Sequence, residues 1–295
     1  MQIKVENLSY AYGSKKTKSI ALNNLSLTIE EGEFFGIIGQ TGSGKSTFVQ
    51  HLNGLIKAQQ GSVMVGDYNL TDKKCKFKEL RSKIGMVFQY PEYQLFAETV
   101  FEDVAFGLKN FFPKLTGEEI EEKVKSAIEM VGLDYKKIKD KSPFDLSGGQ
   151  KRRVAIAGVI VSRPEILVLD EPVAGLDPKG KREFVALLKS LHNSFVKTII
   201  IVSHDMNLVS ENCSRVAVFK RGEIVKTGTP KEIFSDSELL SSCGLEKCTT
   251  AFLTEKLKGV GVKVDSDLTI DNFIEAYLKA KKTQDQKAKE WGEEL

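Results

Sequence analysis

The spacing of apolar residues predicts that strands and helices alternate along most of the chain. Ile3 and Val5 alternate with charged neighbours, which is the two-residue period of a half-buried strand, and the same period returns over residues 25–29. Residues 34–38 are continuously apolar and end at a glycine, as a strand buried on both faces does, and residues 46–55 then favour a helix. Further strands are expected at residues 62–65, 84–88, 166–169, 198–202, 215–219 and 223–225. This alternation predicts an α/β sheet domain.

The middle of the chain, about residues 90–160, has a helical period instead. Thr116 and Glu119 have the spacing of a capping box, and apolar residues recur on one helical face from Ile120 to Val131. We therefore expect a helical subdomain inserted into the sheet domain.

The pattern changes again after about residue 235. Helical spacing returns at residues 273–278, and residues 279–295 are polar, which indicates a solvated helix end or tail. We predict a main domain over residues 1–235 and a small, α-rich C-terminal domain over residues 236–295.

Composition narrows the class of protein. The 295 residues are 41% hydrophobic and 28% charged, which excludes a disordered or fibrous chain. The net charge of +3 is small for a dedicated nucleic-acid binder, so no nucleic-acid partner is expected. The apolar stretch at residues 154–161 is too short to span a bilayer, and the N-terminus lacks the apolar core of a signal peptide. The cysteines follow no zinc or disulfide spacing: Cys75, Cys213, Cys243 and Cys248. These features favour a cytosolic, reduced protein.

Residues 39–46, GQTGSGKS, fit the P-loop pattern G-x-x-x-x-G-K-[ST] between an apolar strand and a helix. The glycines let backbone N–H groups turn toward phosphate oxygens, and the helix N-terminus adds positive potential. Lys45 can reach the β- and γ-phosphates of a nucleotide, and the Ser46 hydroxyl can hold Mg²⁺. A glycine-rich turn before a helix is the alternative, but the complete pattern in this context favours a phosphate site. The expected nucleotide contacts are Gly39, Gln40, Thr41, Gly42, Ser43, Gly44, Lys45, Ser46 and Thr47.

A second motif, PEILVLDEP at residues 164–172, ends an apolar strand in two acids. Asp170 is placed to hold Mg²⁺ through its water shell, and Glu171 is placed to act on the attacking water. Two acids at a strand end before a turn are common in isolation. Their place 125 residues after Lys45, in an α/β pattern, favours the nucleotide triphosphatase interpretation.

A third motif, LSGGQ at residues 146–150, identifies the kind of triphosphatase. Ser147, Gly148, Gly149 and Gln150 open a helix, and a helix N-terminus with a glycine pair can bind an anion. An ordinary helix cap is the alternative. Because the motif precedes Asp170 by 20 residues, the chain resembles the ATP-binding cassette (ABC) ATPase family, whose signature motif is LSGGQ.

Other marks of that family follow in the expected order. Gln89 ends a predicted strand and resembles the Q-loop glutamine. Residues 174–177, AGLD, resemble the D-loop, and Asp177 with the proline after it also forms an N-cap and N1 pair. His204 ends another strand and resembles the switch histidine. The resemblance covers about residues 1–230 and implies a P-loop NTPase fold, with a RecA-like mixed sheet, an antiparallel β subdomain and an inserted helical subdomain.

Two tyrosines are candidates for the residue that contacts adenine. Tyr12 lies 33 residues before Lys45 and resembles the aromatic residue that stacks on adenine in the family. Tyr10 is the competitor in the same segment, and the glycine after Tyr12 favours Tyr12.

The resemblance implies a dimer in which ATP lies between the P-loop of one subunit and the signature of the other. Ser147 and Gly149 would then act on the nucleotide of a partner ATPase, with their neighbours Gly148 and Gln150. The resemblance also implies the roles of the remaining residues: Mg²⁺ organised by Ser46, Gln89 and Asp170, the attacking water oriented by Glu171, and the γ-phosphate contacted by His204.

The segment after the Q-loop glutamine indicates the kind of ABC system. Residues 89–108, QYPEYQLFAETVFEDVAFGL, resemble the energy-coupling factor (ECF) and cobalt-type importer ATPases, and most closely the second, A-prime ATPase of the pair. Residues 144–159 agree, and residues 245–278 resemble the small domain of these ATPases.

We therefore expect an ATPase that drives uptake of a vitamin or transition-metal ion from the cytoplasmic face of the cell membrane. The implied partners are a second ATPase, a transmembrane coupling subunit and a substrate-binding membrane subunit. The alternatives are a homodimeric ATPase of a conventional ABC importer or exporter, and a soluble ABC switch protein.

The same segment offers a surface for the coupling subunit. Glu92, Tyr93, Leu95 and Phe96 are expected to form a groove, in which Glu92 pairs with a basic residue and the apolar side chains receive a coupling helix. The alternative is that Leu95 and Phe96 belong to the core of the helical subdomain and Glu92 is solvated.

Overall fold

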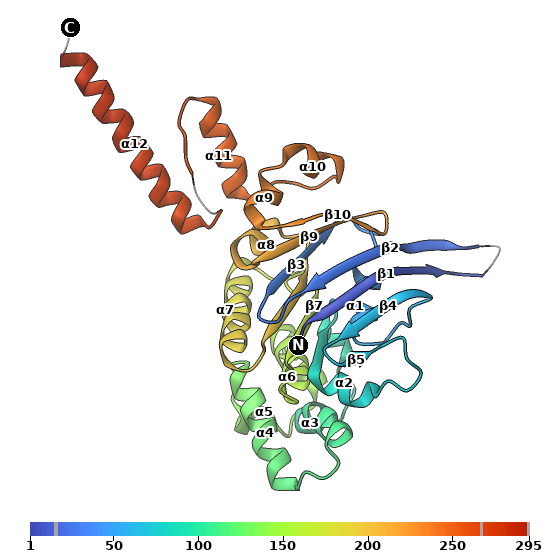
Figure 1. Cartoon of the computed structure of the whole chain (residues 1–295). Coiled ribbons are helices and arrows are strands. Elements are labelled where there is room, and N and C mark those ends of the chain that lie inside the picture. Colours follow the sequence, from blue (N-terminus) through green and yellow to red (C-terminus); the bar gives the residue numbers. More distant parts are fainter. Residues whose placement is uncertain (15–16, 266–267, 294–295) are drawn as a thin grey trace.

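Two sheets form the centre of the computed structural model, which describes residues 1–14, 17–265 and 268–293 (Figure 1). Of residues 284–293 only the helical backbone is described. The larger sheet has the strand order β10-β9-β3-β8-β7-β6, and the smaller has the order β2-β1-β4-β5. The fold is therefore α/β with a separate antiparallel sheet, as the resemblance implied.

The larger sheet is parallel except at one edge. Its strands are β3 (Phe34–Gly39), β6 (Ile84–Val87), β7 (Ile166–Asp170), β8 (Thr198–Val202), β9 (Arg215–Lys220) and β10 (Glu223–Gly228). Only β10 runs antiparallel, to β9. Every residue of β3, β6, β7 and β8 is buried, which explains their continuous apolar sequences, because both faces of the sheet are covered.

The smaller sheet is antiparallel and consists of β1 (Ile3–Tyr12), β2 (Ser19–Ile29), β4 (Gln60–Val65) and β5 (Tyr68–Asn69). β1 and β2 form a long hairpin, so β2 begins well before the alternation predicted at residues 25–29. Asn23 and Asn24 interrupt the apolar alternation in the middle of β2 and hid this extension, which pairs with β1. The short β5 and α2 (Phe77–Lys83) were also missed by the sequence analysis.

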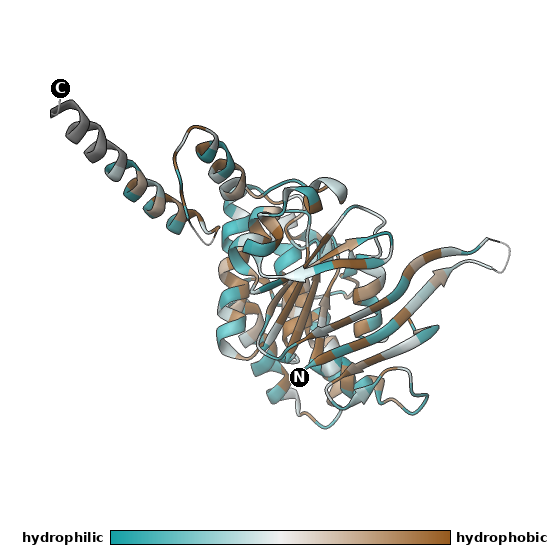
Figure 2. Cartoon of the chain, turned by 45° about the horizontal axis from the view of Figure 1, so that its top comes forward, coloured by the Kyte–Doolittle hydropathy of each residue, from teal (hydrophilic) through white to brown (hydrophobic). Residues whose placement is uncertain are grey.

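The two faces of the larger sheet have different coverings. One face packs against α1 (Lys45–Leu52) and the smaller sheet, through a buried cluster that includes Phe35, Phe48 and Phe219. The other face packs against helices, including α7 (Pro178–Ser194) and α8 (Met206–Asn212), through a cluster that includes Ile38 and Leu169. Figure 2 shows the apolar strands enclosed between these layers.

The helical subdomain lies at one end of the molecule (Figure 1). It consists of η1 (Pro91–Gln94), α3 (Val100–Phe111), α4 (Gly117–Met130), α5 (Tyr135–Ile138), η2 (Pro143–Asp145) and α6 (Gly148–Ile160). The helical content predicted for residues 90–160 is confirmed, and so is the capping box of Thr116 and Glu119 at the start of α4. α3, α4 and α6 pack on one another and share the helix-side cluster with the sheet.

The C-terminal part consists of α9 (Pro230–Phe234), α10 (Ser237–Ser242), α11 (Thr249–Gly259) and α12 (Ile270–Glu293). Phe234 and Leu240 are fully buried in the helix-side cluster, so α9 and α10 pack on the main domain. α12 projects away from the body of the molecule, with Ile270, Ile274 and Leu278 exposed along one side (Figure 1). Within the described residues, no helix is both long and apolar enough to cross a membrane.

The burial of Phe234 makes it a test of how firmly the C-terminal part is attached. We expect Phe234→Ala to lower the free energy of unfolding by about 3–5 kcal/mol, because it leaves a cavity in a packed cluster. Chemical denaturation of the full chain measures this change. Phe252→Ala is the matched control, since that ring on α11 is half exposed. Equal losses for the two variants would contradict the packing described.

Candidate functional site

The P-loop connects β3 to α1, and its glycines adopt a backbone that other residues resist. Gly42 and Gly44 have φ values of 79° and 102°, in the left-handed region. A Cβ atom on Gly44 would also collide with the carbonyl oxygen of Ala21 on β2. The glycine spacing of the motif is therefore required by the path of this loop against the smaller sheet.

Lys45 folds back over the loop. Its Nζ donates hydrogen bonds to the carbonyl oxygens of Gly39 at 2.7 Å and Gln40 at 2.9 Å. Burial lowers the pKa of Lys45, and the negative charges of Glu171 and Asp170 oppose this shift. Beside it, the Ser43 hydroxyl is buried without a hydrogen-bond partner. Because Lys45 lines the pocket above this loop and Ser43 does not, the buried ammonium group is the side chain that fits a phosphate here.

A pocket of about 470 Å³ opens above this loop, at the carboxyl ends of the parallel strands. It gathers most of the predicted site from segments far apart in the sequence: Tyr12, Thr41, Gly42, Gly44, Lys45, Ser46, Thr47, Gln89, Asp170, Glu171 and His204. Ser19, Ile20 and Ala21 of β2 also line it. The sequence analysis missed these three because it expected this strand only from residue 25 onward, whereas β2 begins at Ser19.

Asp170 ends β7 and lies next to the P-loop helix. Its carboxylate accepts a hydrogen bond from the Ser46 hydroxyl. Burial raises the pKa of Asp170, as does the charge of Glu171, whereas Ser46 and Lys45 lower it. A hydroxyl and a carboxylate held together, with the amide oxygen of Gln89 in the same pocket, are the oxygen ligands that Mg²⁺ prefers.

Glu171 and His204 form a pair at the mouth of the pocket. The Oε2 atom of Glu171 lies 2.7 Å from Nδ1 of His204 and 3.3 Å from its backbone nitrogen. Glu171 also has a φ of 49°, a left-handed backbone that is unusual for a residue with a side chain. Its N–H donates to Val202 at 2.9 Å, which holds this strained backbone against β8. Such strain is typical of functional positions and here fixes the direction of the carboxylate.

The two tyrosine candidates have different environments. Tyr12 is 43% exposed and lines the pocket. Its hydroxyl oxygen lies 3.3 Å from Oγ1 of Thr47. Tyr10 is partly buried against the sheet cluster, and its ring packs edge-on against His51 at 5.0 Å. Tyr12 is therefore accessible to a ligand in the pocket, whereas Tyr10 packs against the sheet cluster and His51.

The signature residues do not line the pocket of their own chain. Ser147 caps α6 in a capping box with Gln150, and these residues lie on the surface with Gly148 and Gly149. Gly149 and Asp177 instead line a separate cavity of about 460 Å³ between α6 and α7. The structure therefore leaves the signature and the D-loop free of the nucleotide pocket within one chain.

The predicted coupling groove is corrected at one position. Leu95 is only 6% exposed and belongs to the core of the helical subdomain, so it cannot receive a partner at the surface. Phe96 and Tyr93 are exposed, by 59% and 84%, whereas Glu92 is half-buried beside α6. The predicted alternative is thus right for Leu95, wrong for Phe96, and wrong for Glu92, whose Oε2 atom is buried rather than solvated.

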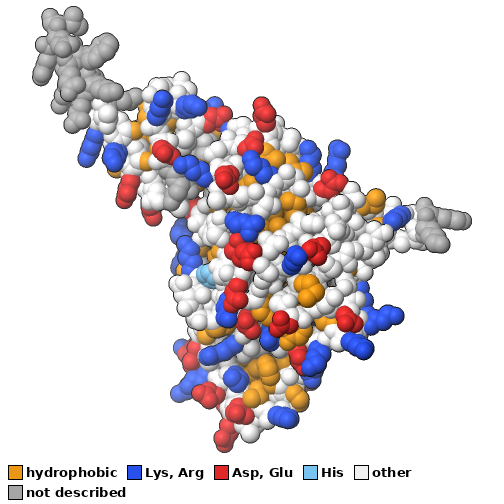
Figure 3. All heavy atoms as spheres, viewed as in Figure 1, with side chains coloured by type: hydrophobic (Ala, Val, Ile, Leu, Met, Phe, Trp, Pro, Cys, Tyr) orange, Lys and Arg blue, Asp and Glu red, His pale blue; other side chains and the backbone are white. Residues whose placement is uncertain are grey.

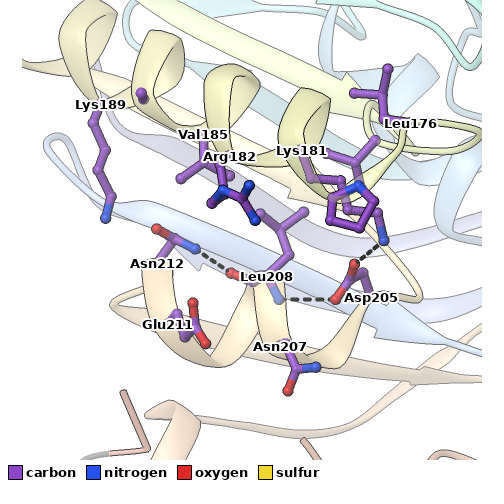
Figure 4. Close-up of a pocket in the computed structure, with 13 residues that line it drawn as sticks. Leu176, Lys181, Arg182, Val185, Lys189, Asp205, Asn207, Leu208, Glu211 and Asn212 are labelled. Carbon is purple, nitrogen blue, oxygen red and sulfur yellow. Dashed lines mark hydrogen bonds and ion pairs between the residues drawn. The ribbon is translucent and has the colours of Figure 1, made fainter. Parts of the chain in front are cut away.

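A further cavity of about 570 Å³ lies between α7 and α8, away from the nucleotide pocket (Figure 4). At one end of it Lys181 Nζ donates to Asp205 Oδ2 at 2.7 Å. Asp205 directly follows His204, and Lys181 lies in the first turn of α7 after Asp177. This ion pair, which the sequence analysis missed, links the switch segment to the D-loop helix. The position of Asp205 directly after the predicted switch histidine was the sequence feature that could have pointed to it.

This fold and this pocket define an ABC-type ATPase. The family model described as ABC transporter matches residues 22–174, and the solved ATP-binding cassette MJ0796, in a dimeric post-hydrolysis state with ADP and Pi, is 32% identical with a TM-score of 0.70. That likeness covers 77% of this chain and 98% of the MJ0796 chain.

The chain belongs to the family of energy-coupling factor transporter ATP-binding proteins, of the EcfA2 type. The EcfA2 protein of Clostridium perfringens is 50% identical over 280 residues, which cover 94% of this chain and 98% of the relative. The solved cbiO1 of Clostridium perfringens, part of the ABC transporter complex cbiONQ, is 39% identical with a TM-score of 0.70, over 86% of this chain and 98% of cbiO1. The ECF-type importer ATPase expected from residues 89–108 is thereby confirmed at the level of the family.

The contrast between the tyrosines gives a test of the adenine contact. We expect Tyr12→Ala to raise the Kd for ATP about tenfold, because a stacking surface for the base is lost. Tyr12→Phe should stay close to wild type, since the ring remains. Equilibrium binding of a fluorescent ATP analogue measures both. Tyr10→Ala is the control and should alter stability more than affinity; a tenfold rise in Kd for that variant would reverse the assignment.

Proposed function

We propose that the chain is the A-prime ATPase of an ECF-type importer and binds and hydrolyses ATP to power uptake of a vitamin or transition-metal ion. The observation that carries the proposal is the single pocket in which Lys45, Asp170, Glu171 and His204 meet, in a chain of the EcfA2 family. The proposed location is the cytoplasmic face of the cell membrane, where protein partners hold the chain.

The pocket suggests how its residues divide the work. Backbone N–H groups of the P-loop and Lys45 would bind the phosphates, and Ser46, Gln89 and Asp170 would hold Mg²⁺. The metal supplies charge neutralisation at the phosphates when bound. Glu171 would orient and polarise the attacking water, and His204, 2.7 Å from it, would keep that carboxylate aimed and contact the γ-phosphate.

A complete site requires a second ATPase in this proposal. Ser147, Gly148, Gly149 and Gln150 lie outside the pocket of their own chain, so they are available to the nucleotide of a partner, together with Asp177 of the D-loop. The N-terminus of α6 would then direct its positive end at the γ-phosphate across the interface. We propose a related but different ATPase as this partner.

Residues 236–295 are the proposed C-terminal domain and dimerisation element. Ile270, Ile274 and Leu278 lie along one side of α12 and are about half exposed, as is Phe252 of α11. An apolar stripe of this kind is typical of a helix that packs against another chain. α9 and α10 would anchor the element to the main domain through Phe234 and Leu240.

The helical subdomain carries the proposed docking surface for a transmembrane coupling subunit. The substrate-binding membrane subunit is the other proposed membrane partner. Phe96, two residues after η1, packs edge-on against Phe106 of α3 at 4.9 Å, and both rings remain more than half exposed. Tyr90 and Tyr93, which precede Phe96 in the sequence, form a second aromatic pair. Figure 3 shows hydrophobic side chains exposed over this end of the molecule. Exposed aromatic clusters are enriched in protein interfaces, and this one adjoins Gln89.

The proposed water-orienting role gives a direct test. We expect Glu171→Gln to keep the ATP affinity but to lower kcat by at least about 10²-fold, because a general base is lost. ATP hydrolysis and analogue binding by the purified transporter complex measure the two effects. Glu165→Gln is a control at the other end of the same strand, in a surface ion pair with Lys83. Wild-type turnover by Glu171→Gln would disprove the role.

The docking surface has its own test. We expect Phe96→Ser to reduce co-purification of membrane subunits and substrate uptake several-fold, because a central aromatic contact is lost, with ATP affinity unchanged. Val225→Ser removes an exposed apolar side chain from β10 and serves as the control. Normal assembly of Phe96→Ser would argue against this surface. In the same purification, a second ATPase of different mass supports the heterodimer, whereas a single ATPase supports the conventional homodimer.

A further inference from the structure

Arg152 is a buried cation whose contacts the proposed function leaves unexplained. It lies in α6, two residues after the signature, and is 7% exposed. Its guanidinium donates Nη1–H to the carbonyl oxygen of Ala174 at 3.0 Å and Nη2–H to that of Pro172. Both carbonyls belong to the short segment between Glu171 and Asp177. Arg152 therefore ties the signature helix to the chain that leads from the water-orienting glutamate to the D-loop.

A negative charge that acts on Arg152 belongs to Glu92 of the lid, which we define as η1, residues 91–94. The lid packs against α6. The Nε atom of Arg152 and the Oε2 atom of Glu92 are both buried, and neither has a hydrogen-bond partner. Burial lowers the pKa of Arg152, and the negative charge of Glu92 opposes this shift, so the two groups lie within electrostatic reach. Buried polar atoms without partners are costly, and here a donor and an acceptor of opposite charge share one interface.

We propose that Arg152 is a positioning residue for ATP hydrolysis, which joins the lid, through Glu92, to the backbone carbonyls that precede the D-loop. The planar guanidinium suits this task, because its donors point in fixed directions and can serve two carbonyls and a carboxylate at once. A shift of the lid changes the distance between the Glu92 carboxylate and the guanidinium, and the two carbonyl bonds carry the resulting displacement of Arg152 toward Asp177. Glu92 thereby acts inside its own chain. The inference depends on ATPase activity and is independent of which chain docks on the lid.

The test is a double-mutant cycle in the purified transporter complex with the full-length chain. We expect Arg152→Met to lower kcat about 10- to 100-fold through misplacement of catalytic groups. The Kd for an ATP analogue should change by less than about threefold, because the P-loop is untouched. Glu92→Gln should lower kcat about three- to tenfold on its own and have no further effect when Arg152 is already Met, since the effects of residues that interact are not additive.

Arg153→Met provides the matched control. This neighbouring arginine on the same helix donates to the carbonyl oxygen of Val131 and pairs with Glu183 of α7, away from the lid. Glu92→Gln should therefore lower kcat by the same factor with and without Arg153. Equal effects of Glu92→Gln with and without Arg152 would overturn the proposal.

Arg152→Lys keeps the test decisive if the Met variant fails to assemble. Lysine retains the charge beside Glu92 but cannot serve both carbonyls and the carboxylate, so we expect kcat between those of wild type and Glu171→Gln, with unchanged ATP affinity. Wild-type kcat for Arg152→Lys would also overturn the proposal. A loss of uptake without any change in these ATPase measurements would indicate an effect on the docking surface alone and would contradict the positioning role of Arg152. The docking proposal and the Arg152 proposal can therefore fail separately.

Discussion

Parallel pairing of the central strands is the constraint on which the rest of the molecule depends. Because β3, β6, β7 and β8 run in the same direction, their carboxyl ends meet at one edge of the sheet. The P-loop follows β3, Gln89 follows β6, Asp170 ends β7 and His204 follows β8. Four segments that are distant in sequence thus deliver their polar residues to one pocket, while the apolar strands behind them are buried on both faces and hold the edge rigid.

The electrostatics of the pocket arise from the same arrangement. A buried lysine, two acids and the N-terminus of α1 lie at a sheet edge where water is partly excluded, so their charges act on one another more strongly than they would at the surface. Lys45 rests on P-loop carbonyls, and Glu171 is held by its backbone conformation and by His204. Such a site is preorganised for an anion and spends little energy on rearrangement when one binds.

The parts outside the sheet connect this pocket to other surfaces. Arg152 binds the segment after Glu171 from the helical side, and Lys181 binds Asp205, next to the switch histidine, from α7. The signature helix and the D-loop helix are therefore joined to the catalytic edge by charged side chains with defined partners, rather than by loops alone. An arrangement of this kind allows a change at an interface to reach the pocket through a few hydrogen bonds.

Local motifs predicted much of this protein because their chemistry is local. The P-loop, the acid pair, the signature and the capping boxes each depend on residues within one turn or strand end, and the spacing of apolar residues revealed the buried strands and the helical subdomain. Where two residues in one segment had similar patterns, the sequence could favour one, as it favoured Tyr12, but could not establish their environments. Tyr10 and Tyr12 both precede the P-loop, and Leu95 and Phe96 are adjacent apolar residues.

The sequence by itself determined the phosphate chemistry, the class of ATPase and the order of the buried parallel strands. Only the tertiary structure decided that Tyr12 faces the pocket, that Leu95 is core and Phe96 surface, that Ser19, Ile20 and Ala21 join the site, and that Glu92 lies near Arg152. The physical reason is the range of the forces involved. A motif works through backbone geometry over a few residues, whereas burial and charge pairing depend on which distant segments pack together.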